Sequence, residues 1–265
     1  MKLKKLVKKG LIIATIGTIV ISLIGCGSSK EETNTMDKDI LVLGFDDTFV
    51  PMGFKGDNGE YTGFDIELAE EISKKLGKKI EYQPIDWTMK ESELNNGNVD
   101  LLWNGFSITE ERKKKVDFTK PYLKNTQGIV VLADSDIKTK EDLKGKTVAA
   151  QDQSSAVDAI GDYKDNFKEL VTFSTNDEAL RDLEAGRCDA VVADEVLVKY
   201  YTNLKGTEKY KILDDNFGEE EYAVGVRKGD TELVDAWNKA YDEIVADGTA
   251  GEISKKWFGS DIVEK

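Results

Sequence analysis

The side chains that most often carry out covalent catalysis are scarce in this sequence. It contains no histidine, and its two cysteines are Cys26 and Cys188. Histidine is the commonest general base and metal ligand, so serine–histidine and cysteine–histidine catalysis and the usual zinc sites are excluded. Cys188 falls in a predicted apolar strand, where we expect a small buried residue. We therefore predict no catalytic residue, no metal and no cofactor, and turn to groups that could be acylated or could bind a ligand.

Cys26 is the residue most clearly placed for chemistry, because it ends the box LIGC at residues 23–26. Five lysines lie within residues 2–9, and the apolar run that follows them, 11–25, has fifteen residues. This run is shorter than the roughly 20 residues of a membrane helix and is typical of a secretory signal. The box resembles that of bacterial lipoproteins, in which the cysteine is acylated and the leader is cut just before it. The alternative is an uncleaved helical anchor with an incidental cysteine.

The resemblance to lipoproteins gives the beginning of the chain a defined plan. We expect a signal peptide at 1–25, a lipid on Cys26 and a polar, flexible tether at 26–38. The lipid alone would hold the mature chain on the outer, extracytoplasmic face of the cell membrane.

The charge of the chain limits its partners. The formal net charge is −14, and removing the five lysines of the leader lowers it to −19. A surface this acidic excludes nucleic acid and anionic membrane surfaces as partners. The roughly 240 residues after the leader are enough for one large domain or two lobes of about 100 residues each.

Hydrophobic periodicity predicts alternating strands and helices from residue 39 onward. We expect a strand at 40–44, a helix over 64–76 and a strand near 79–83. A second helix over 89–96 ends at a glycine before a strand at 99–103. This alternation is typical of an α/β fold.

An internal similarity suggests that the architecture is used twice. Residues 93–105 (ELNNGNVDLLWNG) resemble residues 182–194 (DLEAGRCDAVVAD), each combining a helix end, a glycine and an apolar strand. Similarity this short also arises from ordinary helix-to-strand connections, so two equivalent lobes and coincidence both stay open. In parallel sheets the loops after the strands line a crevice. Those loops are DDTFVP (46–51), NGFSIT (104–109), QDQSS (151–155) and ADEV (193–196).

The run NGFSITEERKKKVDFTKPY at 104–122 resembles the signature of the polar amino-acid-binding proteins of ABC importers. Further similar runs follow in that family's order: GFDIELAEEISKKLG, DLKGKTV, GRCDAVVAD, VRKGD and DGTAGEISKKWFG. The resemblance implies a two-lobed type II periplasmic-binding-protein fold with a two-segment hinge. Lobe 1 would comprise residues 39–122 and 223–265, lobe 2 residues 123–222, and the crossovers near 122–126 and 221–225 would form the hinge.

The resemblance also assigns residues that would bind the charged ends of an amino acid, because neither charge of a zwitterion can be buried without a partner. Arg112, placed by a helix that starts at 109–111, would bind the carboxylate with its planar fork, and Ser107 would add a hydroxyl. By alignment with the family, Asp194 would bind the ammonium group together with the carbonyl of Gly105. The alternatives are a solvated helix charge for Arg112 and a helix N-cap for Asp194.

Side-chain recognition is assigned in the same way. Asp46, Phe49 and Trp87 align with residues that contact the ligand side chain, the alternatives being an Asx turn for Asp46 and core packing for the aromatic residues. In lobe 2 the loop QDQSS departs from the family's glycine-and-threonine loop and offers Gln151, Ser154 and Ser155. Glutamine, arginine and cystine all stay open as ligands.

The function implied is a lipid-anchored, monomeric receptor that delivers a polar L-amino acid to an ABC permease served by a separate ATPase subunit. The sequence contains no G-x-x-x-x-G-K-[ST] phosphate loop of its own. One alternative is an enzyme on the same fold that resembles cyclohexadienyl dehydratase, with a cleft carboxylate as the acid. The other is a ligand-sensing ectodomain, which we consider less favoured because no membrane segment or kinase part follows residue 258 in this sequence.

Overall fold

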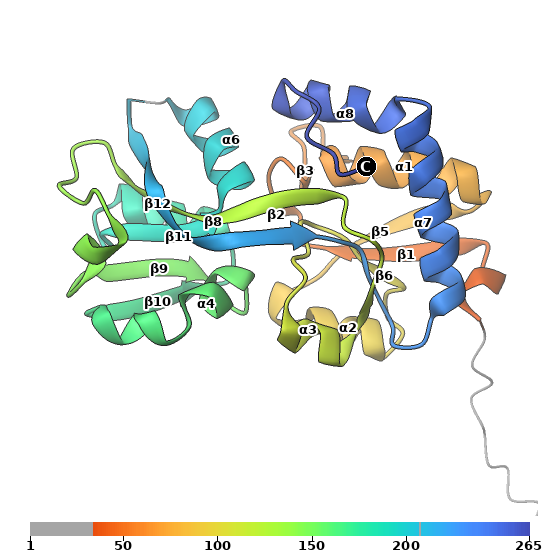
Figure 1. Ribbon diagram of the computed structural model, residues 1–265, viewed down its shortest axis with the longest axis horizontal. Coiled ribbons are helices and arrows are strands. Elements are labelled where there is room, and N and C mark those ends of the chain that lie inside the picture. Colours follow the sequence, from red (N-terminus) through yellow and green to blue (C-terminus); the bar gives the residue numbers. More distant parts are fainter. Residues whose placement is uncertain (1–33, 207) are drawn as a thin grey trace, which may run out of the picture. The chain divides into compact units, whose positions relative to one another are not determined.

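The computed structural model describes residues 34–206 and 208–265, which form one compact unit with two five-stranded sheets (Figure 1). We call the first sheet with its helices lobe 1 and the second sheet with its helices lobe 2. The expected signal peptide, Cys26 and the tether up to residue 33 lie outside the described residues. Within the described ranges, no helix combines the length and apolarity needed to cross a membrane.

Lobe 1 is assembled from two separate parts of the chain. The strand order of its sheet is β5 (Lys79–Pro84), β1 (Ile40–Phe45), β6 (Leu101–Leu102), β13 (Gly225–Val226) and β7 (Asp117–Phe118). Strand β1 is parallel to β5 and β6, whereas β13 is antiparallel to β6 and β7. The helices are α1 (Phe64–Leu76), α2 (Lys90–Asn95), α3 (Glu110–Lys115), α7 (Thr231–Ala246) and α8 (Thr249–Phe258), with η1 (Thr35–Asp37) and η2 (Trp87–Met89). A small sheet of β2 (Thr48–Phe49), β3 (Gly53–Lys55) and β4 (Tyr61–Thr62) follows β1.

Lobe 2 comes from one continuous stretch. Its strand order is β10 (Glu169–Phe173), β9 (Thr147–Gln151), β11 (Ala190–Asp194), β8 (Leu123–Leu132) and β12 (Tyr210–Tyr222). The helices are α4 (Ser155–Ile160), α5 (Asn176–Glu184) and α6 (Glu195–Lys205), with η3 (Lys140–Leu143) and η4 (Gly161–Asn166). The similarity between 93–105 and 182–194 corresponds to equivalent structure, since α2 leads through Gly97 to β6 and α5 leads through Gly186 to β11.

Two long antiparallel strands, β8 and β12, connect the lobes (Figure 1). Leu123 pairs with Tyr222, and the Tyr122 N–H donates to the Tyr222 carbonyl at 2.9 Å. The register between the strands shifts on either side of Asn216. The two-segment hinge of the expected fold is confirmed. The division at 122/123 and 222/223 stays a prediction.

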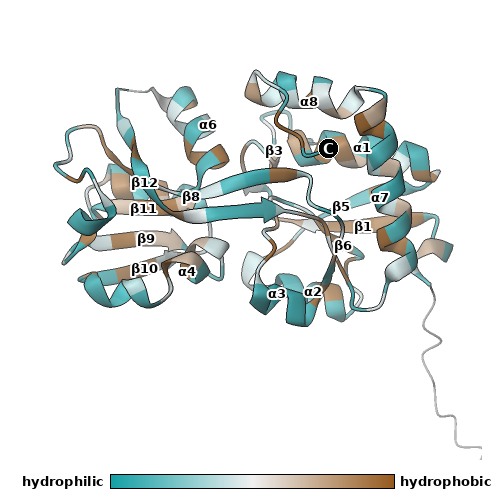
Figure 2. Cartoon of the chain, in the orientation of Figure 1, coloured by the Kyte–Doolittle hydropathy of each residue, from teal (hydrophilic) through white to brown (hydrophobic). Residues whose placement is uncertain are grey.

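Helix α1 shows why the local sequence folds as predicted. Its apolar residues recur at helical spacing, and Phe64, Ile66, Leu68, Ala69 and Ile72 are buried. Gly77 ends the helix in the left-handed conformation with φ 66°. Figure 2 shows the same pattern across the fold, with brown central strands β1, β9 and β11 and teal on the outer face of α3.

Cys188 differs from its expected position. It lies in the turn before β11 and not within a strand, because the strand begins only at Ala190. The side chain is nevertheless buried as expected, and burial raises the pKa of its thiol to about 12.

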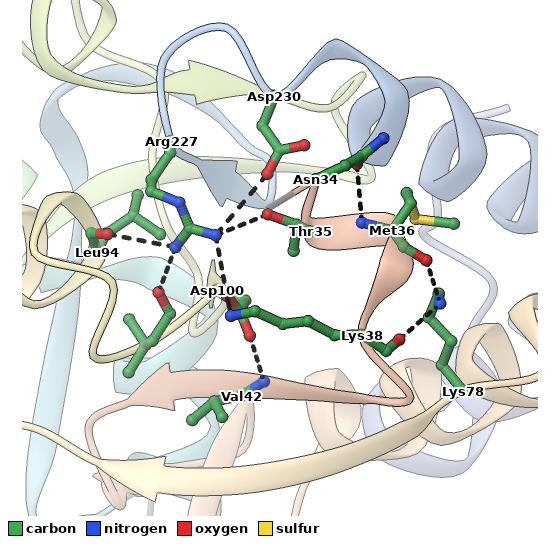
Figure 3. Close-up of polar contacts among 11 residues, drawn as sticks. Asn34, Thr35, Met36, Lys38, Val42, Lys78, Leu94, Asp100, Arg227 and Asp230 are labelled. Carbon is green, nitrogen blue, oxygen red and sulfur yellow. Dashed lines mark hydrogen bonds and ion pairs between the residues drawn. The ribbon is translucent and has the colours of Figure 1, made fainter. Parts of the chain in front are cut away.

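The first described residues are bonded to lobe 1 (Figure 3). The Arg227 guanidinium donates to the Thr35 hydroxyl at 2.7 Å and to Asp100 at 2.9 Å, and Lys38 Nζ lies 2.6 Å from the same Asp100 oxygen. Lys78 Nζ donates to the carbonyl groups of Met36 and Lys38, both at 2.7 Å. Residues 34–38, which we expected to belong to a flexible tether, are therefore part of the folded lobe.

Candidate functional site

Residues from both lobes line one small cavity where the carboxyl ends of β1, β6, β9 and β11 meet. The lining residues are Asp46, Phe49, Trp87, Asn104, Gly105, Arg112, Gln151, Ser154, Ser155 and Asp194. The space between them is about 10 Å³, which holds about one water molecule. A larger solute must therefore separate the two walls to enter. Nine of the lining residues are those for which we predicted a binding role, and that role stays a prediction.

Arg112 lies buried in the wall formed by lobe 1, with 4% of its surface exposed. Thr109 caps helix α3 by accepting from the Arg112 backbone N–H at 3.2 Å. The guanidinium lies over the Phe106 ring at 4.6 Å and donates to the carbonyl of Ser107 at 2.9 Å. Among residues 34–206 and 208–265, no carboxylate lies within 4 Å of it, so this buried cation has hydrogen bonds but no counter-ion. The solvated position that we considered as an alternative is wrong.

Asp194 lies at the end of β11 in the wall formed by lobe 2, with 6% exposure. It is the N-cap residue of α6 by position, as the alternative expected, but its side chain accepts no hydrogen bond from that helix. Its Oδ1 instead accepts from Asn125, Gln127 and Tyr222 at 2.8, 2.9 and 2.7 Å. Burial, and then the neighbouring Glu220, raise the pKa of Asp194 well above its ordinary value.

Asp46 and Gln151 meet across the cavity. Asp46 Oδ1 accepts from the backbone N–H and the hydroxyl of Thr48 in an Asx turn, while Oδ2 accepts from Gln151 Nε2 at 2.8 Å. Behind Gln151, the Asn176 amide donates to its Oε1 at 3.0 Å and fixes its orientation. Burial raises the pKa of Asp46 although three hydrogen bonds oppose this. Asp46 thus has both the Asx turn and an oxygen that faces the other lobe.

Further polar contacts join the two walls. The hydroxyl groups of Ser107 and Ser155 lie 2.9 Å apart, although Ser107 does not line the cavity itself. The carbonyl of Gln153 accepts from Lys90 at 2.9 Å and from Arg112 at 3.4 Å. Ser154 donates back to the Gln151 carbonyl at 2.7 Å and stabilises this turn.

Gly105 occupies a position that requires glycine. Its φ is 57°, and a Cβ there would lie 2.6 Å from Phe49 Cε1. The Gly105 N–H donates at 2.8 Å to Asp65, which also accepts from the Tyr122 hydroxyl at 2.9 Å. Complete burial raises the pKa of Asp65 to about 7. Asp65 thereby connects the cavity wall with the start of the hinge.

Two aromatic side chains form the apolar part of the lining. Phe49 and Trp87 are both buried, and Trp87 packs edge-on against Phe106 with ring centres 5.8 Å apart. They can contact the aliphatic or aromatic part of a ligand side chain. No cluster of three or more metal-ligating side chains occurs in the part of the chain that the structure describes.

Sequence reasoning missed several residues of this site. It gave Asn104 only as part of the loop 104–109 and assigned it no role, yet Asn104 lines the cavity. The sequence also did not predict the partners of Asp194. Asn125, Gln127 and Glu220 lie on β8 and β12, and the register shifts between these strands cannot be derived from periodicity. The one available signal was the alternation of Asn125 and Gln127, which places both on the same face of a strand.

Comparisons with known proteins agree with this geometry. Residues 41–260 match the family model of bacterial extracellular solute-binding proteins, family 3. The L-cystine-binding protein TcyJ of Escherichia coli K12 is 30% identical over 270 residues, covering 95% of this chain and 97% of that protein. The arginine-binding extracellular protein ArtP of Bacillus subtilis is 34% identical over 261 residues, covering 95% and 98%. A crystal structure of an ABC uptake transporter substrate-binding protein from Streptococcus pneumoniae with bound histidine has a TM-score of 0.84 and 41% identity, covering 87% and 97%.

Proposed function

This chain belongs to family 3 of the bacterial extracellular solute-binding proteins, and from that premise we propose that it binds a polar L-amino acid between its lobes for an ABC importer. The family places the protein outside the cytoplasm. Curated relatives are named as binding proteins for cystine and arginine, and a solved neighbour contains histidine. Delivery to a permease with a separate ATPase subunit, and attachment through a lipid on Cys26, are the finer parts of the proposal.

One observation supports an amino acid most strongly. Arg112 is a buried cation without a counter-ion, and Asp194 is a buried acid with no lysine or arginine within 4 Å among the described residues. Both line the same cavity. An α-carboxylate and an α-ammonium group would supply the two missing charges, and a ligand with only one of them would leave a buried charge unpaired.

The rest of the lining restricts the side chain of that amino acid. Asp46 directs one oxygen toward lobe 2, where Gln151 now occupies it. An amide or guanidinium group of the ligand can replace the Gln151 amide as donor, and Phe49 and Trp87 can contact the chain that leads to it. We therefore keep glutamine, arginine and cystine as the ligand classes to test first.

A thermal-shift screen of residues 27–265 against all amino acids tests the proposal. A ligand present at about 100 times its dissociation constant stabilises the folded state by about 2.7 kcal/mol. We expect a shift with one or a few polar L-amino acids and none with their decarboxylated or deaminated analogues. No shift with any amino acid contradicts the proposed function. Formation of product from prephenate or arogenate would favour the dehydratase alternative.

A further inference from the structure

Asp194, which lines the cavity, has a second carboxyl group beside it that belongs to Glu220. Glu220, on the hinge strand β12, accepts from Asn125 Nδ2 at 2.7 Å and from Gln127 Nε2 at 2.8 Å. The same two nitrogen atoms donate to Asp194 at 2.8 and 2.9 Å. Asn125 and Gln127 alternate along β8 and so present both amides to one side. The two carboxyl groups are held against each other by shared donors.

This arrangement lacks a positive charge. Among the side chains that the structure describes, no lysine or arginine nitrogen lies within 4 Å of either carboxyl group. Asp194 is buried and has the Glu220 carboxyl group beside it, so a negative charge on both groups at once costs free energy that one retained proton avoids. The raised pKa of Asp194, caused first by burial and then by Glu220, agrees with this expectation.

The surrounding charged groups do not remove the repulsion between the Asp194 and Glu220 carboxyl groups. Tyr222 donates its hydroxyl to Asp194, and Arg112 interacts with both acids only over a longer distance. Asp158 and Glu91 also act on Arg112 from beyond ion-pairing distance and offset part of its charge. Of the charged groups on adjoining elements, Glu195 of α6 pairs with Lys199 at 2.8 Å. Lys124 of β8 pairs with Glu264 at 3.5 Å and is thereby engaged elsewhere.

We propose that Asp194 and Glu220 share one proton when the cleft is empty and release it to solvent when the ammonium group of an amino acid binds beside them. This inference rests on the proposed function and adds Glu220 to the site. The ammonium group keeps its three protons, so the pair becomes doubly negative as one positive charge arrives. The net charge at this end of the cleft is the same before and after binding.

Linkage fixes the sign of the resulting pH dependence. The empty protein holds one more proton than the complex, so affinity rises with pH until the empty pair has lost its proton. One exchanged proton lowers the dissociation constant up to about ten-fold for each unit of pH.

Calorimetric titration of the parent protein in two buffers measures the exchange without any substitution. At about pH 6, phosphate and Bis-Tris take up a released proton with different heats. We expect the two binding enthalpies to differ by about the difference between the ionisation enthalpies of the two buffers, which corresponds to one proton. Equal enthalpies, together with clear binding, overturn the shared proton but leave the proposed function standing. Absence of binding by any amino acid removes both.

Asp46 also lines the cavity and has a raised pKa, so proton release by the parent protein could come from Asp46 or from the Asp194–Glu220 pair. The variant Glu220→Gln distinguishes these two sources. The variant should lose the buffer-dependent part of the enthalpy and show a flatter pH profile. Glu221→Gln is the matched control, since it changes the same residue type on the exposed side of the same strand and should behave like the parent. Retained proton release in Glu220→Gln contradicts the proposal. If that variant fails to fold, loss of the infrared band of a protonated carboxylic acid on ligand binding to the parent gives the same answer, and its persistence overturns the inference.

Discussion

Burial of Arg112 and Asp194 costs free energy of folding, because each charged group loses its hydration and neither faces an opposite charge within ion-pairing distance. Different neighbouring groups reduce this free-energy cost for the two residues. Arg112 has backbone carbonyls and an aromatic face, whereas Asp194 has amide and hydroxyl donors. Such unbalanced charges lower stability in the empty protein and favour any ligand that brings both missing charges at once. At the scale of single residues, the two side chains that least favour the unliganded fold are those to which we assign the charged ends of the ligand.

Asp46→Ala should change which amino acid is preferred. Removing an oxygen that accepts from an amide or guanidinium group should weaken that ligand by about 1.5 to 3 kcal/mol, while apolar amino acids lose little. The measurement is a ranked binding panel for the parent and the variant, with Asp57→Ala in an exposed loop as control. A uniform loss across the panel would show that Asp46 only supports the cleft.

Asp65→Asn should alter the pH dependence of stability. The pKa of Asp65 rises from 3.8 to about 7 on folding, so the folded state holds more protons between these values and stability falls as pH rises through this range. The asparagine variant lacks this contribution, and its stability relative to the parent should increase by up to about 4 kcal/mol from pH ~4 to pH ~8. Denaturant unfolding at several pH values measures it. Parallel pH profiles for the two proteins would show that Asp65 is ionised throughout.

At the scale of elements, the site depends on loops that follow parallel strands. The turn after β6 carries Gly105 in a left-handed conformation, and the Asp65 carboxyl group on α1 fixes its N–H. The turns after β9 and β11 supply the opposite wall. Each wall is thus formed by short connections at the end of a sheet, so we expect relative movement of the two sheets to open or close the cavity.

Gly105→Ala tests this turn. The Cβ would meet Phe49 at 2.6 Å in addition to the strain of φ 57°. Gly145→Ala is the control, because φ is 71° there but nothing lies within 4 Å. Both should lose about 1 to 3 kcal/mol of stability, and only Gly105→Ala should also lose affinity for the ligand. Unchanged affinity in Gly105→Ala would mean that the turn does not contact the ligand.

The sequence alone predicted the helices and strands more closely than it predicted the contacts between them. Helix 64–76 has the expected bounds, since its periodicity and terminal glycine agree, whereas the strand expected at 99–103 pairs only over Leu101–Leu102. The helix expected at 89–96 is divided between η2 and α2. Glu220 and Asn176 could not be predicted as members of the site. Their positions depend on strand register and on contacts between segments distant in sequence.

At the scale of the whole molecule, strand β1 separates the start of the described chain from the cleft. The bonds of residues 35–38 to Arg227, Asp100 and Lys78 lie at the amino end of β1 (Figure 3). Asp46 directly follows the carboxyl end of this strand and lines the cavity. The six residues of β1 span about 20 Å. A lipid attached upstream would therefore restrain lobe 1 at the end opposite the cleft and leave closure free, with the ligand shifting the hinge equilibrium toward the closed state.

Cys26→Ala should abolish attachment to the membrane through lipid. The box LIGC and the short apolar run before it motivate this expectation, because the Cys26 thiol is the group that we propose to be acylated. Labelled fatty acid should enter the parent and not the variant, which should accumulate as a precursor of higher mass. Cys188→Ala is the control and should take up label like the parent. Equal labelling of the Cys26 variant and the parent would place the anchor elsewhere.

We propose that one buried cation, Arg112, and one buried acid, Asp194, bind the two charges of an amino acid. Calorimetric titration of Arg112→Ala and Asp194→Ala with the ligand found for the parent tests it most directly, with exposed Lys114→Ala as control. We expect each cleft variant to stay folded and to lose affinity by about 3 kcal/mol or more, since one ligand charge would be buried without its partner. The control should bind like the parent. Near-parental affinity in both folded cleft variants would contradict the account.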